Sequence, residues 1–225
     1  MLDLFCGAML RGAIEGTLDA FAQREGVDLR RTYNGCGILV AQMNAGARPD
    51  AYFACDQSFL DRVQTRFHPG RVVSSNPLVL ITQPGNPLAL RELEDLLRPD
   101  LRVGLADPHK SALGSLSRQV LQRAQLHQAL EESGNVRVWT PTGDMLTNQL
   151  LTGSLDAALV YASNTPKAKV HVVPLGAAGA RARQPWAAAR LSPHRLLLER
   201  LYKALTADGQ RAQFEGLGFG WEAGS

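Results

Sequence analysis

Three cysteines and one methionine are the residues of this chain whose types and spacing most clearly suggest chemistry. Cys6, Cys36 and Cys55 each lie at or just after the end of a short apolar segment, and Met9 follows Cys6 by about one helical turn. Sulfur ligands gathered at one edge of a sheet select Cu(I), so these four residues are a candidate soft-metal site. An odd number of widely spaced cysteines is more typical of small core residues, or of one disulfide in an oxidising compartment. The core or disulfide interpretation is the favoured one.

Four short turns precede predicted helices and are candidates for binding an anion through the backbone. They comprise residues 8–11, 35–37, 111–113 and 142–145. The first N–H groups of a helix have no intrahelical partner, and the helix dipole favours negative charge beside them. Gly35 and Gly37 allow the backbone to approach a ligand closely. Every α/β protein has strand-to-helix turns, so the turns alone do not identify a ligand.

Catalytic chemistry is not indicated. Cys36 stands between two glycines and faintly resembles a nucleophile elbow, but the longer G-x-S-x-G motif is absent. The histidines show no spacing that suggests a metal site or a catalytic dyad. Arg11 falls in the first turn of a predicted helix, where a cation opposes the dipole. An anionic ligand beside Arg11 would offset that misfit, and a solvated surface position is the alternative. We predict a binding protein without a cofactor, not an enzyme.

Composition places the chain among globular proteins with a core of their own. Of the 225 residues, 45% are hydrophobic and 20% are charged. The net charge of +3 comes from dispersed arginines without a basic run, so we expect no nucleic-acid surface. No apolar segment approaches the roughly 20 residues that span a bilayer. Because the chain opens directly into a predicted strand, we expect that a signal peptide preceded it and was removed.

Short apolar runs alternate with amphipathic segments, which is typical of α/β packing around mostly parallel sheets. The pattern predicts two lobes with a hinge and a cleft between them, lobe 1 over 1–78 plus 176–225 and lobe 2 over 79–175. A single doubly wound domain is the alternative. Predicted strands cover 2–5, 29–33, 51–54, 71–82, 102–106, 136–139, 156–161 and 169–174. Predicted helices cover the segment after residue 10 up to Gly26, then about 38–43, from 58, 93–97, 111–125, from 144, 193–206 and 209–214.

Several segments, in order along nearly the whole chain, resemble the molybdate-binding proteins of ABC transporters, a branch of the type II periplasmic solute-binding proteins. The family's Gly-Ser-Ser-Gly turn corresponds to the segment 33–37, and its Gly-Ala-Pro-Ala-Asp-Val-Phe segment to 46–53. The other matching segments are 5–10, 54–56, 76–80, 106–108 with 113–114, 153–162 and 214–219.

The resemblance implies the periplasmic-binding-protein type II fold and a function in transport. It implies a periplasmic or extracytoplasmic monomer that binds a small oxyanion such as molybdate or tungstate, closes around it, and delivers it to the membrane permease of an ABC transporter. A ligand-sensing module cut from a larger regulator is an alternative, although no DNA-reading helix is evident. A Cu(I) binder using the cysteines is another alternative.

Two positions at which the family places serine hydroxyls hold Met9 and Cys36 here, and a small alanine becomes Leu113. A thioether donates no hydrogen bond and a thiol donates only weakly. Tyr161 keeps the family's phenol. The candidate ligand-binding residues are therefore Ala8, Met9, Arg11, Gly35, Cys36, Cys55, Leu113, Gly143 and Tyr161. Cys6 enters only with the soft-metal alternative.

Overall fold

The chain forms two compact units. The computed structural model describes residues 1–166, 168–176 and 179–224. Unit 1 comprises Met1–Ser75 and Arg183–Ser225, and unit 2 comprises Asn76–Ala182. Two strands, β4 (Arg71–Thr82) and β9 (Arg181–Ala188), run from one unit into the other. The sequence placed the boundaries at 78/79 and 175/176, a few residues away, because a boundary inside a continuous strand leaves no break in the hydrophobic pattern.

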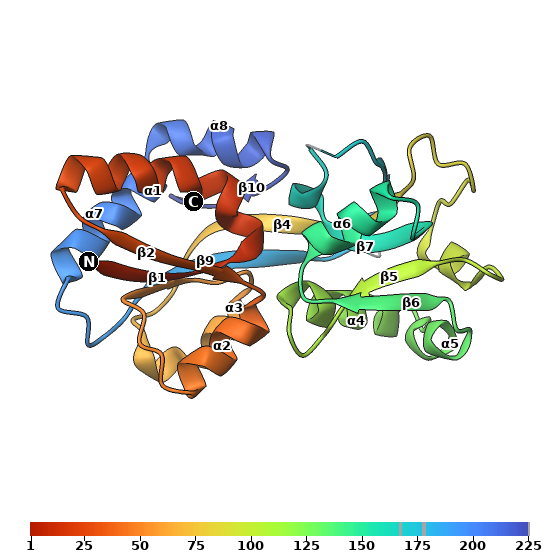
Figure 1. The fold of residues 1–225 in the computed structure, drawn as a ribbon, viewed down its shortest axis with the longest axis horizontal. Helices are drawn as coiled ribbons and strands as arrows, with labels where there is room; N and C mark the ends of the chain where they lie inside the picture. The colour runs from red at the N-terminus through yellow and green to blue at the C-terminus, as the bar shows by residue number, and fades with distance from the viewer. Residues whose placement is uncertain (167, 177–178, 225) are drawn as a thin grey trace. The chain divides into compact units, whose positions relative to one another are not determined.

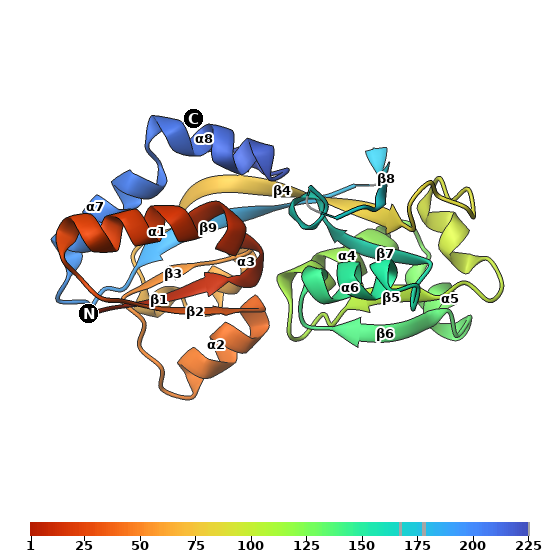
Figure 2. The same cartoon turned by 45° about the horizontal axis from the view of Figure 1, so that its top comes forward.

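The sheet of unit 1 contains three parallel strands. These are β1 (Leu2–Gly7), β2 (Leu29–Asn34) and β3 (Ala51–Phe53), with β1 between the other two. β9 pairs antiparallel with β3 on its other side (Figure 2). The short β10 (Gly220–Trp221) pairs antiparallel with β4. Because β1, β2 and β3 are parallel, their carboxyl ends lie at one edge of the sheet.

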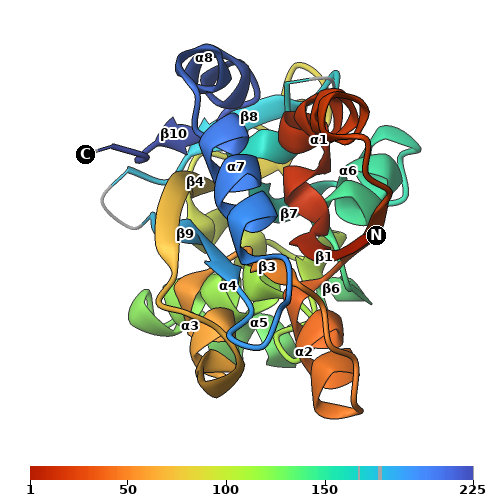
Figure 3. The same ribbon diagram turned by 90° about the vertical axis from the view of Figure 1, so that its left-hand side faces the viewer.

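Helices cover both faces of the unit 1 sheet, as Figure 1 and Figure 3 show. The helices α1 (Arg11–Glu25), α7 (Arg195–Leu205) and α8 (Asp208–Gly216) lie on one face, and α2 (Cys36–Asn44) and α3 (Gln57–Asp61) lie on the other. Two 3₁₀ turns, η1 (Ala8–Leu10) and η2 (Gln64–Arg66), complete the unit.

The first helix shows why these residues fold as predicted. Ala13, Ile14, Leu18 and Phe21 fall on one face of α1 and are fully buried in the core of unit 1, which also holds side chains of the sheet and of α7. Burial of each large apolar side chain stabilises the fold by about 1.5–3 kcal/mol. Gly26 then ends α1 in the left-handed conformation, with φ of 63°, as a C-cap glycine should.

Unit 2 repeats the same arrangement with its own parallel strands. β5 (Val103–Ala106) lies between β6 (Val136–Thr140) and β7 (Ala157–Tyr161). The second half of β4 pairs antiparallel with β7 and with β8 (His171–Pro174). The helices are α4 (Ala112–Arg123), α5 (His127–Glu132) and α6 (Gly143–Leu151), with 3₁₀ turns η3 (Leu93–Leu97) and η4 (Ala162–Asn164).

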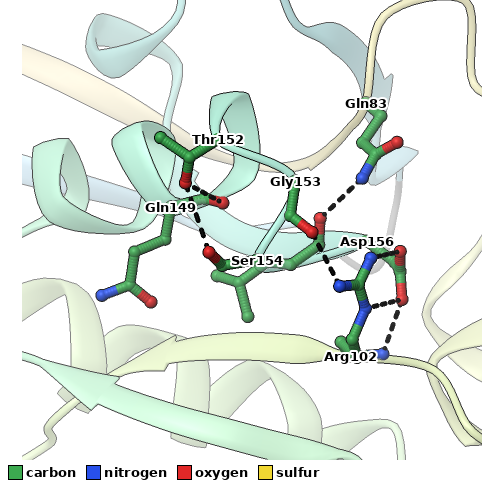
Figure 4. Close-up of polar contacts among 8 residues, drawn as sticks. Gln83, Arg102, Gln149, Thr152, Gly153, Ser154 and Asp156 are labelled. Carbon is green, nitrogen blue, oxygen red and sulfur yellow. Dashed lines mark hydrogen bonds and ion pairs between the residues drawn. The ribbon is translucent and has the colours of Figure 1, made fainter.

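An ion pair fastens the amino ends of β5 and β7 in unit 2 (Figure 4). The Arg102 guanidinium donates to both carboxylate oxygens of Asp156, at 2.6 and 3.0 Å, and also to Gly153 O at 2.7 Å. The backbone N–H of Arg102 donates to the same carboxylate at 2.9 Å. Gln83 adds a bond from its side-chain amide to Leu155 O at 3.0 Å. This bidentate arrangement holds the loop that follows α6 against the start of β5.

The α/β class predicted from the sequence is confirmed in both units, with four differences in the elements. β9, β10 and α5 were not predicted, and the segment 93–97 forms a 3₁₀ helix. β9 contains Pro185 and two exposed arginines, which made it look like a loop. Pro77 lies within β4, the strand that crosses between units, as the sequence suggested. Across the residues described here, no helix combines the length and apolar character required to span a membrane.

Candidate functional site

The carboxyl edge of the unit 1 sheet brings together the candidate residues that follow its three parallel strands. Ala8 follows β1, Gly35 and Cys36 follow β2, and Cys55 lies two residues beyond β3. Gly7, the last residue of β1, packs so closely against the sulfurs of Cys36 and Cys55 that a Cβ there would overlap the Cys55 sulfur. The loops after the three strands therefore meet at one point.

Cys36 and Cys55 form a disulfide, with their Cα atoms 6.2 Å apart. The backbone N–H of Cys55 also donates to the Cys36 sulfur at 3.0 Å. A disulfide between two of the three cysteines was one of the interpretations left open by the sequence. The structure adds which two are paired, and the remaining thiol belongs to Cys6.

The soft-metal alternative is not favoured. It required Cys6, Cys36, Cys55 and Met9 as ligands, but two of those sulfurs are bonded to each other. The Cys6 thiol is buried in the core of unit 1, where burial raises its pKa to about 12, and Met9 packs against the same core. Among the described residues, no group of three or more His, Cys, Asp or Glu side chains is placed to hold a metal ion.

The start of α2 offers backbone donors to an anion. Gly35 is the N-cap, and its own N–H donates to the side-chain oxygen of Asn34 at 2.9 Å. The N–H groups of Ile38 and Leu39 donate to Gly35 O. The N–H groups of Cys36 and Gly37 come earlier in the helix than these first backbone hydrogen bonds. No acidic side chain lies in the first turn of α2 or of α1, so the positive end of neither helix dipole is neutralised by its own helix.

Arg11 already has a carboxylate partner on its own helix. Its guanidinium lies 3.4 Å from the carboxylate of Glu15 and 5.4 Å from the ring centroid of Tyr33. Glu15 also accepts a bond from Arg31 at 2.7 Å, and these contacts with arginine lower the pKa of Glu15 against the opposing effect of burial. The local negative charge that the sequence assigned to a ligand is therefore present within the chain.

In unit 2 the other three candidate residues lie at the carboxyl ends of its parallel strands. Leu113 is buried in the first turn of α4, and Tyr161 is buried as the last residue of β7. Gly143 begins α6 after β6. Gly114, which follows Leu113, packs directly on the backbone of Ala106 and Asp107. This contact holds the start of α4 against the end of β5.

Asn164 organises this part of unit 2 and was not identified from the sequence. Its side-chain oxygen accepts a bond from Tyr161 N at 3.1 Å, and its amide donates to the Asp144 carboxylate at 2.8 Å. A Cβ at Gly143 would overlap the same side chain. Asn164 thus ties the end of β7 to the start of α6. An asparagine three residues after a strand is a common turn residue, and no sequence signal distinguishes this role.

Asn76 is a second polar residue that the sequence reasoning missed. It is fully buried, donates to Ser163 Oγ at 2.7 Å and accepts a bond from Ser163 N at 3.3 Å. Asn76 therefore fixes the turn η4 that carries Asn164. A buried asparagine before a proline in a strand was a detectable anomaly, since an amide in a core must find partners.

Comparisons with known proteins place this geometry in a family. A family model described as bacterial extracellular solute-binding protein matches residues 2–220. Molybdate-binding proteins of Mycobacterium tuberculosis and Mycobacterium bovis are each 29% identical over 167 residues, which is 72% of this chain and 60% of the relative. The matched region is therefore less than two thirds of the length of these relatives.

Two solved structures share the fold over nearly the whole chain. The periplasmic molybdate-binding protein of Azotobacter vinelandii superposes with a TM-score of 0.82 at 17% identity, covering 99% of this chain and 100% of that one. The sulfate-binding protein of Mycobacterium tuberculosis superposes with a TM-score of 0.81 at 17% identity, covering 97% of this chain and 85% of that one. These structures confirm the predicted periplasmic-binding-protein type II fold. With the family model matching almost every residue, the chain belongs to the bacterial extracellular solute-binding proteins.

Proposed function

We propose that this protein binds a small tetrahedral oxyanion outside the cytoplasm, molybdate or tungstate first, and delivers it unchanged to the membrane permease of an ABC transporter. It does so as a monomer, without a cofactor and without nucleic acid. The proposed ligand-contacting residues in unit 1 are Ala8, Gly35, Cys36 and Cys55. Leu113, Gly143 and Tyr161 of unit 2 are proposed as further contacts.

One observation carries the proposal: the backbone N–H groups that start α2 lie at the carboxyl edge of unit 1, and no acidic side chain lies in the first turn of that helix. The N–H groups of Cys36 and Gly37 belong to this helix start, where Cys36 is buried and Gly37 is half-buried. Preorganised N–H groups bind an anion without the free-energy cost of burying a positively charged side chain beside it. The relatives named for molybdate support the same ligand class, and the family supports solute binding.

The order of ligands follows from the relatives, which are named for molybdate. A site of backbone donors selects by the size and geometry of the anion more than by its proton content. Arg11 and Met9 are omitted from the proposed contacts, since Arg11 pairs with Glu15 and Met9 packs on the core. The anion is therefore proposed to bind without a formal positive side chain in unit 1.

The first experiment measures thermal unfolding and calorimetric binding with molybdate, tungstate, sulfate and phosphate. A ligand present at 100 times its Kd stabilises the folded state by about 2.7 kcal/mol, which raises the melting temperature of a chain of this size by roughly 5–11 °C. That shift is expected with molybdate or tungstate and not with sulfate. A shift with sulfate alone would identify sulfate as the ligand in place of molybdate or tungstate. No shift with any oxyanion would refute the proposal.

A matched pair of variants tests the place of binding. Gly37→Asp adds a carboxylate to the first turn of α2, where the dipole favours it but a bound dianion is repelled. Gly209→Asp makes the same change at the same helical position of α8, where a Cβ would meet nothing within 4 Å. Since like-charge juxtaposition costs several kcal/mol, Gly37→Asp is expected to raise the Kd by about 100-fold or more. Equal affinities of the two variants would place the site elsewhere.

A further inference from the structure

The Cys36–Cys55 disulfide connects two of the loops that form the proposed anion site. Cys36 is the first residue of α2, and Cys55 lies in the loop between β3 and α3. Both residues are at most 5% exposed. The covalent link therefore fixes the start of α2, with its N–H donors, to the carboxyl end of a different strand.

Buried neighbours hold the disulfide on further sides. Gly7 at the end of β1 leaves no room for a side chain beside the two sulfurs. Gln184 of β9 is fully buried and donates from its side-chain amide to Cys55 O at 3.0 Å. The oxygen of the same amide accepts a bond from the buried Ser74 Oγ at 2.9 Å. The position of the bridge is thus set by β1 and β9 as well as by the two cysteines.

The start of α2 lacks a capping side chain. The N-cap Gly35 has no side chain, and no side chain caps the helix with a hydrogen bond. The α3 start, in contrast, is capped by Asp56, which accepts Ser58 N at 3.0 Å. A helix start without a cap is the part of a helix most prone to fray. Here the disulfide takes the place of a cap by holding Cys36 from the side.

We propose that the Cys36–Cys55 disulfide is a positioning element of the anion site, so that the oxidised protein binds its oxyanion and the reduced protein binds it more weakly while still folded. This inference rests on the proposed function. Rigidifying a binding loop in its bound conformation increases affinity, because less conformational entropy is lost on binding. Without the bridge, the N–H groups of Cys36 and Gly37 must be ordered by the ligand itself.

The chemistry of opening the bridge is a two-electron reduction. A dithiol reductant supplies two electrons and two protons, the S–S bond breaks, and each cysteine becomes a thiol. The reductant becomes a disulfide. Neither thiol replaces the lost constraint, since a thiol is only a weak donor and acceptor.

The test compares tungstate affinity by calorimetry in four samples: oxidised protein, protein reduced and then desalted without oxygen, Cys36→Ala/Cys55→Ala, and Cys6→Ala. Cys6→Ala is the matched control because it removes the third, buried cysteine and leaves the bridge intact. The reduced sample and the double variant are expected to bind on the order of tenfold more weakly than the other two.

The four affinities distinguish the positioning role of the disulfide from the proposed oxyanion-binding function. Tight binding by all four samples would overturn the positioning role and leave the proposed function in place. Binding by none, including the oxidised protein, would overturn the proposed function and this inference with it. Cys36 and Cys55 are separated by 19 positions in the sequence. Loss of a disulfide that closes a loop of this length should lower the melting temperature by about 7–13 °C. Melting curves therefore show whether the double variant is folded at 20 °C, and the reduced wild-type protein provides the same comparison without a substitution.

Discussion

Gly114 and Gly16 both lie in helices, but the space around them differs. Gly→Ala should therefore destabilise the protein at Gly114 and stabilise it at Gly16. Gly114 lies in the first turn of α4, where an added Cβ would overlap the carbonyl oxygen of Ala106 and backbone atoms of Asp107. Gly16 lies in α1, where an added Cβ would meet nothing within 4 Å. Helix propensity alone predicts that Gly→Ala stabilises both positions by about 0.8–1.0 kcal/mol.

Packing reverses the sign at Gly114. Overpacking a close-packed site costs about 1–3 kcal/mol, and the upper end applies where the obstructing atoms are backbone. Asp107 cannot retreat easily, since its N–H donates to Thr140 O at 2.8 Å and thereby joins the ends of β5 and β6. Subtracting the propensity gain leaves Gly114→Ala destabilised by about 2 kcal/mol. Gly16→Ala should be stabilised by about 1 kcal/mol.

Thermal unfolding followed by circular dichroism at 222 nm, without ligand, measures both variants. For a chain of this size the melting temperature should fall by about 4–8 °C in Gly114→Ala and rise by about 2–4 °C in Gly16→Ala. A Gly114→Ala protein as stable as the wild type would refute the close approach of α4 to β5. Failure of Gly16→Ala to stabilise would instead show that propensity is the wrong reference for these helices.

Two further predictions concern groups whose pKa the fold shifts. The Arg102 side chain donates to Asp156 and lowers the pKa of that carboxyl, so its stabilisation is present above the unfolded pKa of about 3.9 and is lost as pH falls through the lower folded value. The stability of Asp156→Asn should therefore depend less on acidification than that of Glu215→Gln, a control that removes only the exposed pair of Glu215 with Arg211. Equal acid unfolding curves for the two variants would contradict this. Burial raises the pKa of the Cys6 thiol to about 12, so iodoacetamide at pH 8 should label Cys6 only after denaturation, and rapid labelling of the folded protein would show that the thiol is accessible.

The elements with strong periodicity were predicted from the sequence, and those shaped by long-range contacts were not. α1 was predictable because its four buried residues recur at helical spacing and Gly26 ends it. β9 was not, because its place is set by pairing with β3, and Pro185 hides the strand pattern. Residues at the ends of parallel strands could be assigned to one edge, which is why Gly35, Cys36 and Cys55 were grouped correctly in unit 1.

Side-chain direction limited the prediction of the site. Met9 and Cys6 lie within a few residues of that edge, yet Cys6 belongs to the core of unit 1 and the partly buried Met9 packs against that core, since neighbouring residues in a strand or turn point in different directions. The sequence placed four sulfurs at one edge, whereas the fold separates them into one bridge, one core thiol and one thioether packed against the core. Asn164 shows the converse: a residue of an ordinary turn acquires its role only from contacts with Tyr161, Gly143 and Asp144.

The distribution of charge in each unit bears on how a dianion can be selected. In each unit a close ion pair joins the amino ends of neighbouring parallel strands, Arg30 with Asp3 in unit 1 and Arg102 with Asp156 in unit 2. At the carboxyl edge of unit 1 the start of α2 presents backbone N–H groups and a disulfide, while Arg11 is paired with Glu15 and Asp56 caps α3. An unpaired arginine at that edge would attract any carboxylate or phosphate, because its planar donors suit both. The neutral donors of the proposed site have no such general attraction, so its discrimination would come from their spacing, and its selectivity would depend on the rigidity of the α2 start.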